Sequence, residues 1–347
     1  MSGEKRSECV FARRAVRWIG NAVGFSERGR PAGLRQEAKS ASCAFSQTVR
    51  ERKFGICCLG TKAAVLTRRR EMSMKRIAVV TNAGKDKDGA VSAKIGAFLK
   101  EKQVSCTFCG SGEEVPDDSE CVLVLGGDGT LLRAAKEVVD RQIPLLGINL
   151  GTLGYLAEVE AAALVPALSQ LLRGEYTIEK RMMLHGTHMR GGEKIGSDIA
   201  LNDVVLIRRG HLRVLSFENS VNGSPLNSYQ ADGIIISTPT GSTGYSLSVG
   251  GPIVTPDADL ILMTAIAPHT LNTRSVIFKG TDEVTVRVAD GHTAETAEAD
   301  VAFDGNAAFT ALGGDRIVVR RAMRETNILK LSDRSFLEVL RRKMADT

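Results

Sequence analysis

The segment LVLGGDGTLLRAA (123–135) places a carboxylate, Asp128, inside a glycine turn. It is the first of three segments whose residue types could do chemistry. Glycine N–H groups approach phosphate oxygens closely where a helix begins, so Gly126, Gly127 and Thr130 are phosphate-loop candidates. We expect the helix to begin at Thr130, with Thr130 as its N-cap. A carboxylate repels phosphates, but it can accept the proton of an attacking hydroxyl group. The alternative is a turn acid that only favours the helix dipole.

Two familiar phosphate-binding patterns do not fit this turn. The P-loop pattern G-x-x-x-x-G-K-S/T does not occur in the chain. The dinucleotide pattern G-x-G-x-x-G is incomplete, because Leu132 stands where the third glycine belongs. The turn therefore matches neither the P-loop nor the Rossmann fingerprint.

Two further segments carry polar groups in unusual density. Six of the nine residues from Ser237 to Tyr245 bear hydroxyl groups, and four glycines lie within or just after this run. A simple turn needs four residues, so we interpret the run as a ligand-binding loop whose hydroxyl and N–H groups suit ribose and phosphate oxygens. Asn202 and Asp203 stand at the head of a predicted strand, where they are either a polar strand entry or binders of a base edge or a diol.

The pattern around these segments predicts two kinds of domain. Apolar runs predict strands, and helical spacing predicts helices, in alternation: strand 75–81, helix 90–102, strands 104–109 and 121–125, helix 131–139, strand 143–149. This order implies an α/β N-terminal domain with a mostly parallel sheet. After a helix near 161–173, strands with short turns predict a β-rich, antiparallel, sandwich-like C-terminal domain, including a hairpin at Asn222-Gly223. The segment 335–344 predicts a last amphipathic helix.

Charge separates the first 73 residues from the rest. They hold 16 Lys and Arg against 6 Asp and Glu, whereas the remainder holds 30 against 34. The segment is a disordered basic arm, a transit sequence, or a stretch upstream of a true start at Met72 or Met74, and we favour the last. We expect the following division: 1–73 extension, 74–160 α/β domain, 161–325 β-rich domain, 326–347 tail and helix.

Cysteine and hydropathy patterns indicate a cytoplasmic protein. Cys106 and Cys109 form a C-x-x-C with no second pair at zinc spacing, so we expect reduced structural thiols and no metal site. A strand there would point the two side chains to opposite faces. No apolar run reaches the roughly 18–20 residues of a membrane helix, so we expect no membrane partner. The basic charge lies outside the body, so it gives no reason to expect nucleic acid.

The motifs together resemble the NAD kinase family. GGDGTLL, NLGTLGYL, LNDVVL and ADGIIISTPTGSTGYSLSVGGPIV occur in the family's order, and PHTL, FDGN, LGGDRIVV and FLEVLRRK are also similar to it. The resemblance covers about residues 75–345. GGDGT alone is weak, since lipid kinases and phosphofructokinase-like enzymes share it.

The resemblance implies a function and its partners. Family members transfer the γ-phosphoryl group of ATP, and some that of polyphosphate, to the 2′-hydroxyl of the adenosine ribose of NAD. It implies Mg²⁺ or another divalent cation with ATP, no bound prosthetic group, and a homodimer or homotetramer in which a neighbouring subunit helps to hold NAD. It also implies that the C-terminal tail packs back on the first domain.

Site residues follow from the resemblance position by position. Asp128 corresponds to the proton acceptor. The positions that match NAD contacts are Asp128, Gly129, Arg133, Asn202, Asp203, Arg213, Asp232, Thr243, Gly244, Tyr245, Ser246, Leu247, Ser248 and Asn306. The chain departs from the family at Gly244, where alanine is usual, and at Asn306, where glutamine is common.

Two alternatives belong to other classes. A diacylglycerol-type lipid kinase would share GGDGT, but it would have no use for Asn202-Asp203 beside a ribose loop. A non-catalytic NAD-sensing module would keep Asn202 and the 237–248 loop, but it would not need a carboxylate at position 128.

Overall fold

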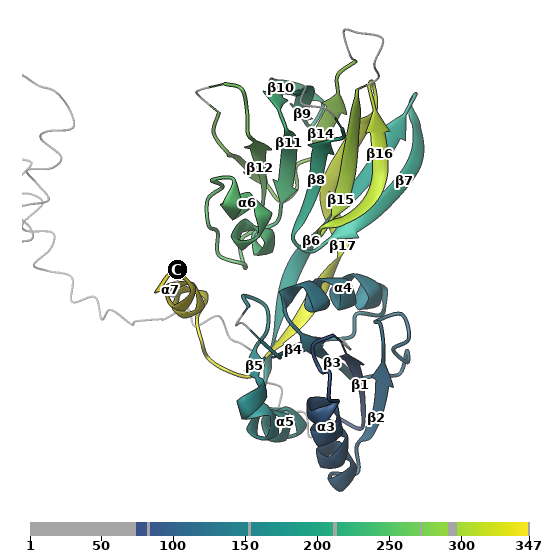
Figure 1. The fold of residues 1–347 in the computed structure, drawn as a ribbon, viewed down its shortest axis with the longest axis vertical. Helices are drawn as coiled ribbons and strands as arrows, with labels where there is room; N and C mark the ends of the chain where they lie inside the picture. The colour runs from purple at the N-terminus through teal and green to yellow at the C-terminus, as the bar shows by residue number, and fades with distance from the viewer. Residues whose placement is uncertain are drawn as a thin grey trace, which may run out of the picture. The chain divides into compact units, whose positions relative to one another are not determined.

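The computed structural model describes residues 74–81, 84–151, 154–210, 214–270, 273–290 and 297–345. They belong to one compact unit, Arg68–Thr347 (Figure 1). Our expectations for residues 1–73 and for the ligand contact of Arg213 lie outside the described residues.

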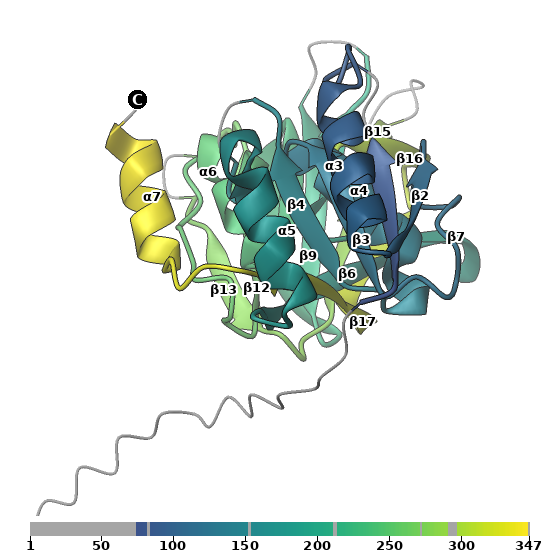
Figure 2. The ribbon, with the colours of Figure 1, turned by 90° about the horizontal axis from the view of Figure 1, so that it is seen from below.

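Parallel strands covered by helices on both faces form the first half of this unit. The strands, in spatial order, are β2 (Ser105–Cys109), β1 (Arg76–Thr81), β3 (Cys121–Gly126) and β4 (Leu145–Asn149). Ile77 and Val79 share a core with helices α3 (Ala90–Glu101) and α5 (Leu164–Leu172). Ala78 and Val80 face the other way and pack with helix α4 (Asp128–Val138). Figure 2 shows these helices and strands from below. Burial on both faces explains why these strands read as unbroken apolar runs.

Short elements complete this half. They are the 3₁₀ turns η3 (Val139–Arg141) and η4 (Ala161–Ala163) and the two-residue strand β5 (Val159–Glu160), which pairs with β4. The expected alternation of strands and helices is confirmed, with bounds that differ by one to three residues.

The second half consists of antiparallel strands in two sheets that share one core. The first set continues the parallel sheet: β6 (Thr177–Arg190), β7 (Glu193–Ala200), β9 (Leu215–Val221), β10 (Ser224–Ala231), β14 (Val284–Val288) and β17 (Arg316–Lys330). The second sheet has the order β13 (Val276–Lys279), β12 (Leu260–Ile266), β11 (Gly233–Ser237), β8 (Asp203–Arg208), β15 (Glu298–Phe303) and β16 (Asn306–Leu312). Phe217 and Phe303, both fully buried, come from opposite sheets and fill the space between them. The expected sandwich-like architecture is confirmed.

Two long strands join the halves. β17 pairs with β14 and β6 in the second half, and its last residues reach the parallel sheet, where Ile328 pairs with Leu145 of β4. β6 and β17 run side by side between the two halves in Figure 1. Helix α5 packs in the core of the parallel sheet, so a domain boundary placed at 160/161 falls before an element of the first half. We therefore propose a boundary after α5.

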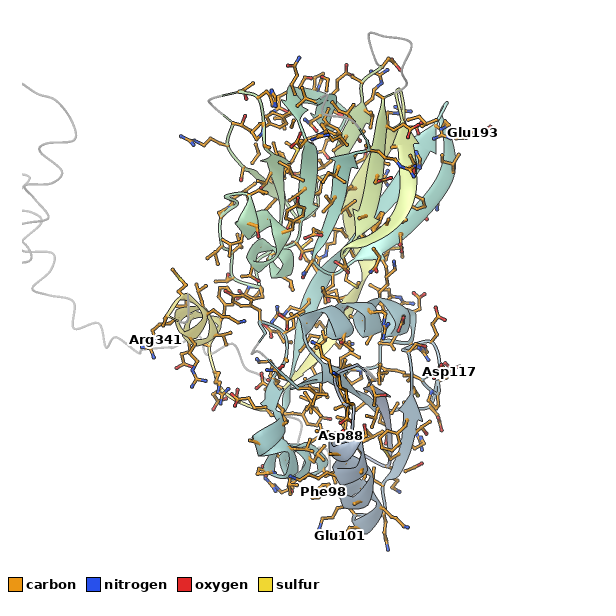
Figure 3. The ribbon with its side chains drawn as sticks, in the orientation of Figure 1. Asp88, Phe98, Glu101, Asp117, Glu193 and Arg341 are labelled. Atoms are coloured by element: carbon orange, nitrogen blue, oxygen red, sulfur yellow. The ribbon has the colours of Figure 1, made fainter. Side chains whose placement is uncertain are left out.

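Turn residues adopt the conformations that their sequence predicts. Asn222 and Gly223 connect β9 to β10 with φ angles of 50° and 77°, as a type I′ hairpin requires. The last helix, α7 (Phe336–Ala345), begins within one residue of the expected start, and its Lys343 lies 5.6 Å from the ring centre of Tyr155. Charged side chains such as Glu101, Asp117 and Arg341 project from the surface (Figure 3).

The cysteines of the described residues are structural. Cys106 packs with the α3 side of the sheet and Cys109 with the α4 side, so the two do lie on opposite faces. Burial raises the pKa of the Cys106 thiol to about 11, and burial also raises the pKa of Cys109. All three cysteines of this part of the chain are free thiols. Within the described ranges, no helix combines the length and the apolar character that a membrane span needs.

Candidate active site

Asp128 lies where a buried strand turns into a helix. β3 ends at Gly126 and α4 begins at Asp128, with Gly127 as the N-cap residue in an extended conformation. Our expectation of a helix start and N-cap at Thr130 is therefore wrong: the helix starts two residues earlier, and its N-cap lies three residues earlier. Thr130 lies inside the first turn and is buried, and a β-carbon on Gly126 would stand 2.6 Å from its Cβ. The absence of a side chain on Gly126 thus leaves room for the Thr130 side chain to pack. Thr130 is not the N-cap, because Gly127 holds that position.

The Asp128 carboxylate is held by backbone N–H groups from another loop. The amide of Tyr155 donates to Oδ2 at 2.8 Å, and the amide of Leu156 donates to Oδ1 at 3.1 Å. The two segments meet because β3 and β4 are parallel neighbours, with Gly126 paired to Asn149, so both following loops leave the same sheet edge. A carboxylate has about four acceptor positions. Two remain for a substrate hydroxyl group.

A lysine that our sequence reading did not select lies beside the glycine turn. The ammonium group of Lys85 stands 2.8 Å from the place where a β-carbon on Gly127 would be. Its neighbour Asp86 accepts hydrogen bonds from the amides of Val91 and Ser92 at the start of α3. The loop after β1 is therefore anchored with a cation at the glycine turn. Its sequence signal was a lysine after the end of a parallel strand.

Asn202 and Asp203 are held by a second carboxylate, Asp304. Its oxygens accept hydrogen bonds from the amides of Leu201, Asn202 and Asp203 at 2.8, 2.7 and 3.2 Å, and its own amide donates to the Asp203 carbonyl at 3.0 Å. Asp304 and Gly305 have φ angles of 50° and 78° and form the turn between β15 and β16. An Asp-Gly hairpin signal was present in the FDGN motif, and it could have identified Asp304.

This pair of carboxylates has perturbed acidity. Burial, and secondly the charge of Asp304, raise the pKa of Asp203 from 3.8 to about 7. Burial also raises the pKa of Asp304, although its three backbone N–H donors and the charge of Lys136 act in the opposite direction. Perturbed carboxylates of this kind gather at functional sites more often than elsewhere. Lys136 belongs to α4, the same helix that begins with Asp128, and forms an ion pair with Asp198 of β7.

The 237–248 loop is folded tightly onto Asn202. It contains the 3₁₀ turn η5 (Thr240–Thr243) and the short helix α6 (Tyr245–Ser248). The Thr238 hydroxyl donates to the Leu201 carbonyl at 2.7 Å, and the Thr238 amide donates to the Asn202 carbonyl at 2.8 Å. A β-carbon on Gly241 would lie 2.6 Å from the Asn202 carbonyl carbon, so glycine is needed for this close approach. The structure therefore brings together two segments that are 35 or more residues apart.

Several hydroxyl groups of this loop make hydrogen bonds within the protein, so they fix the loop in addition to any contact with the expected ligand. Ser242 donates to the Val254 carbonyl and accepts from the Val254 amide, and Thr243 donates to the Thr240 carbonyl. Ser246 is fully buried, and its hydroxyl shares a hydrogen bond with Thr264. The exposed members of the run are Tyr245, Leu247 and Ser248.

One polar atom beside this loop points to a ligand. Oδ1 of Asn202 is buried and has no hydrogen-bond partner among the described residues. A buried acceptor without a donor is unfavourable by about 1–3 kcal/mol, so such atoms commonly serve a ligand. Gly244 borders the same space, because a β-carbon there would lie 3.4 Å from Nδ2 of Asn202 and 3.8 Å from Oδ2 of Asp203. The group can accept from an amino or hydroxyl donor and bind a diol through Asp203.

The remaining predicted contacts are more scattered. Arg133 lies on α4 and is half-exposed beside Glu137. Asn306 is exposed, and its amide side chain donates to the Asp304 carbonyl at 3.4 Å. Asp232 forms an ion pair with Arg208 at 2.6 Å, at the Gly233 end of β11, whereas Asp203 pairs with Ser237 at the other end. One subunit therefore does not bring Asp232 to Asp203.

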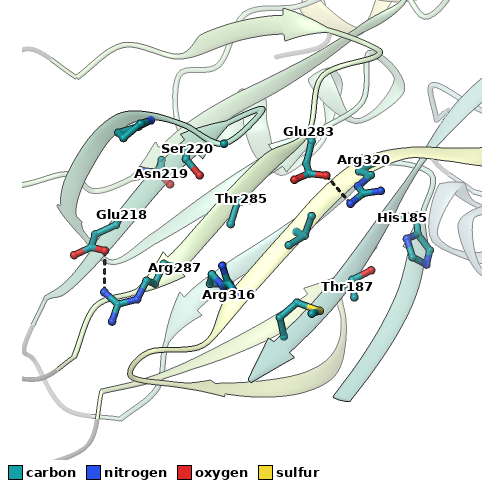
Figure 4. A pocket seen from close by; sticks show the side chains of 14 residues that line it. His185, Thr187, Glu218, Asn219, Ser220, Glu283, Thr285, Arg287, Arg316 and Arg320 are labelled. Atoms are coloured by element: carbon teal, nitrogen blue, oxygen red, sulfur yellow. Dashed lines mark hydrogen bonds and ion pairs between the residues drawn. The ribbon is translucent and has the colours of Figure 1, made fainter. Parts of the chain in front are cut away.

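A hollow of about 560 Å³ lies elsewhere, on an exposed face of β6, β9, β14 and β17 (Figure 4). Its arginines are engaged by glutamates, with Arg287 2.8 Å from Glu218 and Arg320 2.6 Å from Glu283. Among the described residues, its lining includes none of the site residues that we predicted from the sequence. The chemistry described above is therefore not located in this hollow.

Two family models match this chain. The one described as the ATP-NAD kinase N-terminal domain matches residues 69–176, and the one described as the ATP-NAD kinase C-terminal domain matches residues 201–331. Together they account for well over half of the sequence and include GGDGT, Asn202-Asp203 and the 237–248 loop.

Curated relatives agree with these matches. The NAD kinase of Agathobacter rectalis is 46% identical over 284 residues, which cover 79% of this chain and 99% of that protein. The NAD kinase of Lachnospira eligens is 45% identical over 294 residues, which cover 78% of this chain and 100% of that protein.

Solved structures show the same fold at lower identity. Yeast NADH kinase complexed with NADH has a TM-score of 0.72 and 19% identity, covering 79% of this chain and 88% of that one. An NAD kinase from Archaeoglobus fulgidus in complex with ATP has a TM-score of 0.64 and 23% identity, covering 78% of this chain and 99% of that one. At these identities the likeness concerns the fold.

Proposed function

Because this chain belongs to the NAD kinase family, we propose that it phosphorylates the 2′-hydroxyl of the adenosine ribose of NAD with ATP, giving NADP and ADP. The ribose 2′-oxygen forms a bond to the γ-phosphorus of ATP while the bond from that phosphorus to the β,γ-bridging oxygen breaks. The hydroxyl proton goes to the Asp128 carboxylate, and ADP leaves with the bridging oxygen. Phosphoryl transfer depends mainly on positioning and electrostatics, with one group to receive this proton.

The observation that carries the proposal is the fixed carboxylate of Asp128. Two amide N–H groups, from Tyr155 and Leu156, hold both of its oxygens at the N-terminal end of α4. A carboxylate held in one orientation can accept a hydrogen bond from a hydroxyl group and then its proton. A residue that only favoured the helix dipole would not need these two contacts from a separate loop.

On the acceptor side, NAD contacts the Asn202-Asp203 group. The unpartnered Oδ1 of Asn202 accepts from an amino or hydroxyl group of the dinucleotide, and the Asp203 carboxylate accepts from ribose hydroxyl groups. Asp304 fixes the backbone of both residues, so it is a positioning residue. The side chains and backbone of 243–248, Gly129, Arg133 and Asn306 complete the proposed NAD contacts.

On the donor side, the phosphates lie at the glycine turn. The N-terminus of α4 favours negative charge, and the Lys85 ammonium group stands next to Gly127. These groups offset the repulsion between the Asp128 carboxylate and the phosphates. A divalent cation accompanies ATP in this proposal. Within the described residues no three His, Cys, Asp or Glu side chains gather as a ligand set, so we derive no step through a protein-held cation.

A homodimer or homotetramer is part of the proposal. Asp232 precedes Ser237, the β11 partner of Asp203, by five residues, which at about 3.3 Å per residue places Asp232 roughly 17 Å along the strand from the Asp203 end. A neighbouring copy supplies Asp232 more readily than the same copy does. Light scattering of the purified chain should give a mass of two or four subunits, and a monomer at assay concentrations would contradict this part. A cytoplasmic location and polyphosphate as a second donor stay proposals that rest on the resemblance.

The test compares Asp128→Asn with the wild-type chain. Asparagine keeps the shape and one acceptor oxygen but cannot take the proton, so turnover should fall by about 10²–10⁴, the usual range for general base catalysis. NAD binding should change little. Thermal unfolding should occur at a somewhat lower temperature, because the amide –NH2 would face one of the two backbone donors, Tyr155 or Leu156, that bond the carboxylate. A variant that keeps over half of the normal turnover would show that Asp128 only shapes the turn.

Product identity separates the alternatives. A wild-type chain that phosphorylates diacylglycerol and not NAD would support the lipid kinase reading, and one that binds NAD without making NADP would support the sensing module. The family membership favours neither.

A further inference from the structure

Gly154 stands directly against the Asp128 carboxylate, in a loop to which the reaction above gives no side-chain role. A β-carbon built on Gly154 would lie 2.6 Å from Oδ2 of Asp128, and nearer still to Cγ and Oδ1. Carbon atoms that are not bonded to a carboxylate do not approach it so closely. Any side chain at position 154 therefore competes with Asp128 for the same space.

Backbone conformation does not explain the glycine. Nine glycines of the described residues have φ angles in the left-handed region, where a side chain is strained, and Gly154 is not one of them. Its neighbour in the same loop, Gly151, has open space around a built β-carbon and also lacks a left-handed φ angle. What distinguishes Gly154 is the carboxylate that fills its side-chain position.

The close approach has a consequence for the next two residues. Because the chain at Gly154 touches the carboxylate, the amides of Tyr155 and Leu156 come within 2.8 and 3.1 Å of its oxygens. Leu156 is buried in the core beside α4, and Tyr155 lies against Lys343 of α7, so the loop is fixed beyond the contact as well. A methyl group at position 154 would push the loop away from Asp128 or turn the carboxylate.

We propose that Gly154 is a positioning residue for the phosphoryl transfer: the missing side chain lets the 154–156 loop clamp the Asp128 carboxylate in the orientation that accepts the ribose proton. The inference rests on the proposed function for its catalytic half. Its structural half, a steric conflict specific to the pair of residues 154 and 128, can be tested without any assay of activity.

The experiment uses the full chain and four variants: Gly154→Ala, Gly151→Ala, Asp128→Ala, and the double variant Gly154→Ala/Asp128→Ala. In assays with ATP, Mg²⁺ and NAD, Gly154→Ala should lower kcat about 10²-fold, the effect that a displacement near 1 Å has on a catalytic group. The KM for NAD should stay within about threefold, because the proposed contacts of Asn202 and Asp203 with NAD do not involve the 154–156 loop. Gly151→Ala, the matched control, should keep kcat within about threefold. In the Asp128→Ala background, Gly154→Ala should cause no further loss.

Thermal unfolding gives the independent readout. Gly154→Ala should lower Tm relative to the wild-type chain, and Asp128→Ala should recover most of that loss, because it removes the group that the new methyl meets. Equal Tm losses from Gly154→Ala with and without Asp128 would overturn the inference, as would an unchanged kcat. If the wild-type chain makes no NADP, the proposed function fails. The Tm values of the single and double variants still decide whether a side chain at position 154 conflicts with the Asp128 carboxylate.

Discussion

Replacing Asp203 by asparagine should stabilise the protein at alkaline pH while it weakens NAD binding. Asp203 is 5% exposed, and its pKa is raised from 3.8 to about 7, first by burial and then by the charge of Asp304. Asparagine has nearly the same shape and carries no charge at any of these pH values. The substitution therefore removes the titration and leaves the packing intact.

The sign and size of the effect follow from linkage between protonation and folding. Between pH 3.8 and about 7 the folded chain keeps a proton that the unfolded chain has released, so the free energy of unfolding falls as pH rises through this window. Below the window the contribution is fully present, and above it no further change occurs. Each pKa unit corresponds to about 1.4 kcal/mol, so the ionised Asp203 destabilises the fold by at most about 4 kcal/mol at pH 8.

The assay is urea unfolding followed by circular dichroism at pH 5 and pH 8. The gain in unfolding free energy from Asp203→Asn should be larger at pH 8 than at pH 5, by up to about 3 kcal/mol. Asp257→Asn, a substitution of an exposed aspartate, is the matched control and should give the same small change at both pH values. NAD affinity, measured by calorimetry at pH 8, should fall in Asp203→Asn alone. The reasoning would be refuted if the unfolding free energies of the wild-type chain and of Asp203→Asn fell by the same amount between pH 5 and pH 8.

Three other predictions concern separate parts of the molecule. Asn202→Ala should raise the Kd for NAD by roughly 5- to 100-fold, because a buried polar contact is lost, with little change in Tm. An unchanged Kd in calorimetry would show that Asn202 and Asp203 are only polar residues at the start of a strand. Lys85→Met should lower kcat with ATP by about 10-fold or more while the KM for NAD holds, because a cation facing the phosphates is lost; equal effects on NAD binding would place Lys85 on the acceptor side instead. Deletion of residues 1–73 should leave the activity and Tm of the remaining chain nearly unchanged, and a loss of activity above about tenfold would show that the basic segment is needed.

Much of the fold could be predicted because its signals are local. The strands of the parallel sheet are short apolar runs, and Asn222-Gly223 specifies its hairpin within two residues. The start of α4 was misplaced for a local reason as well. Threonine is a good N-cap, so Thr130 attracted the prediction, but the extended Gly127 takes that position and Thr130 is drawn inward to pack over Gly126.

The candidate site was harder to predict where its contacts are distant in sequence. Asp304 holds Asn202 across 102 residues, and Asp128 is held by an amide 27 residues away. A local pattern such as the Asp-Gly turn can locate Asp304, but it does not predict that the Asp304 carboxylate reaches the amides of residues 201–203. The hydroxyl groups of 237–248 are a dense local signal, and several of them also hold the loop in place, as Ser242 does with Val254. Their contacts with a ligand stay a prediction.

The paired strands β6 and β17 set the mechanics of the molecule. They form one ladder from Arg316-Met189 to Lys330-Thr177, and the register shifts between Arg321 and Glu325. A hinge made of a flexible linker would let two halves swing freely, whereas a pair of hydrogen-bonded strands resists bending and couples one half of the molecule to the other. Bending must concentrate at the irregular step around Met323, which is fully exposed. We therefore expect the halves to melt in a single transition, since neither can lose its strands without breaking the ladder of the other.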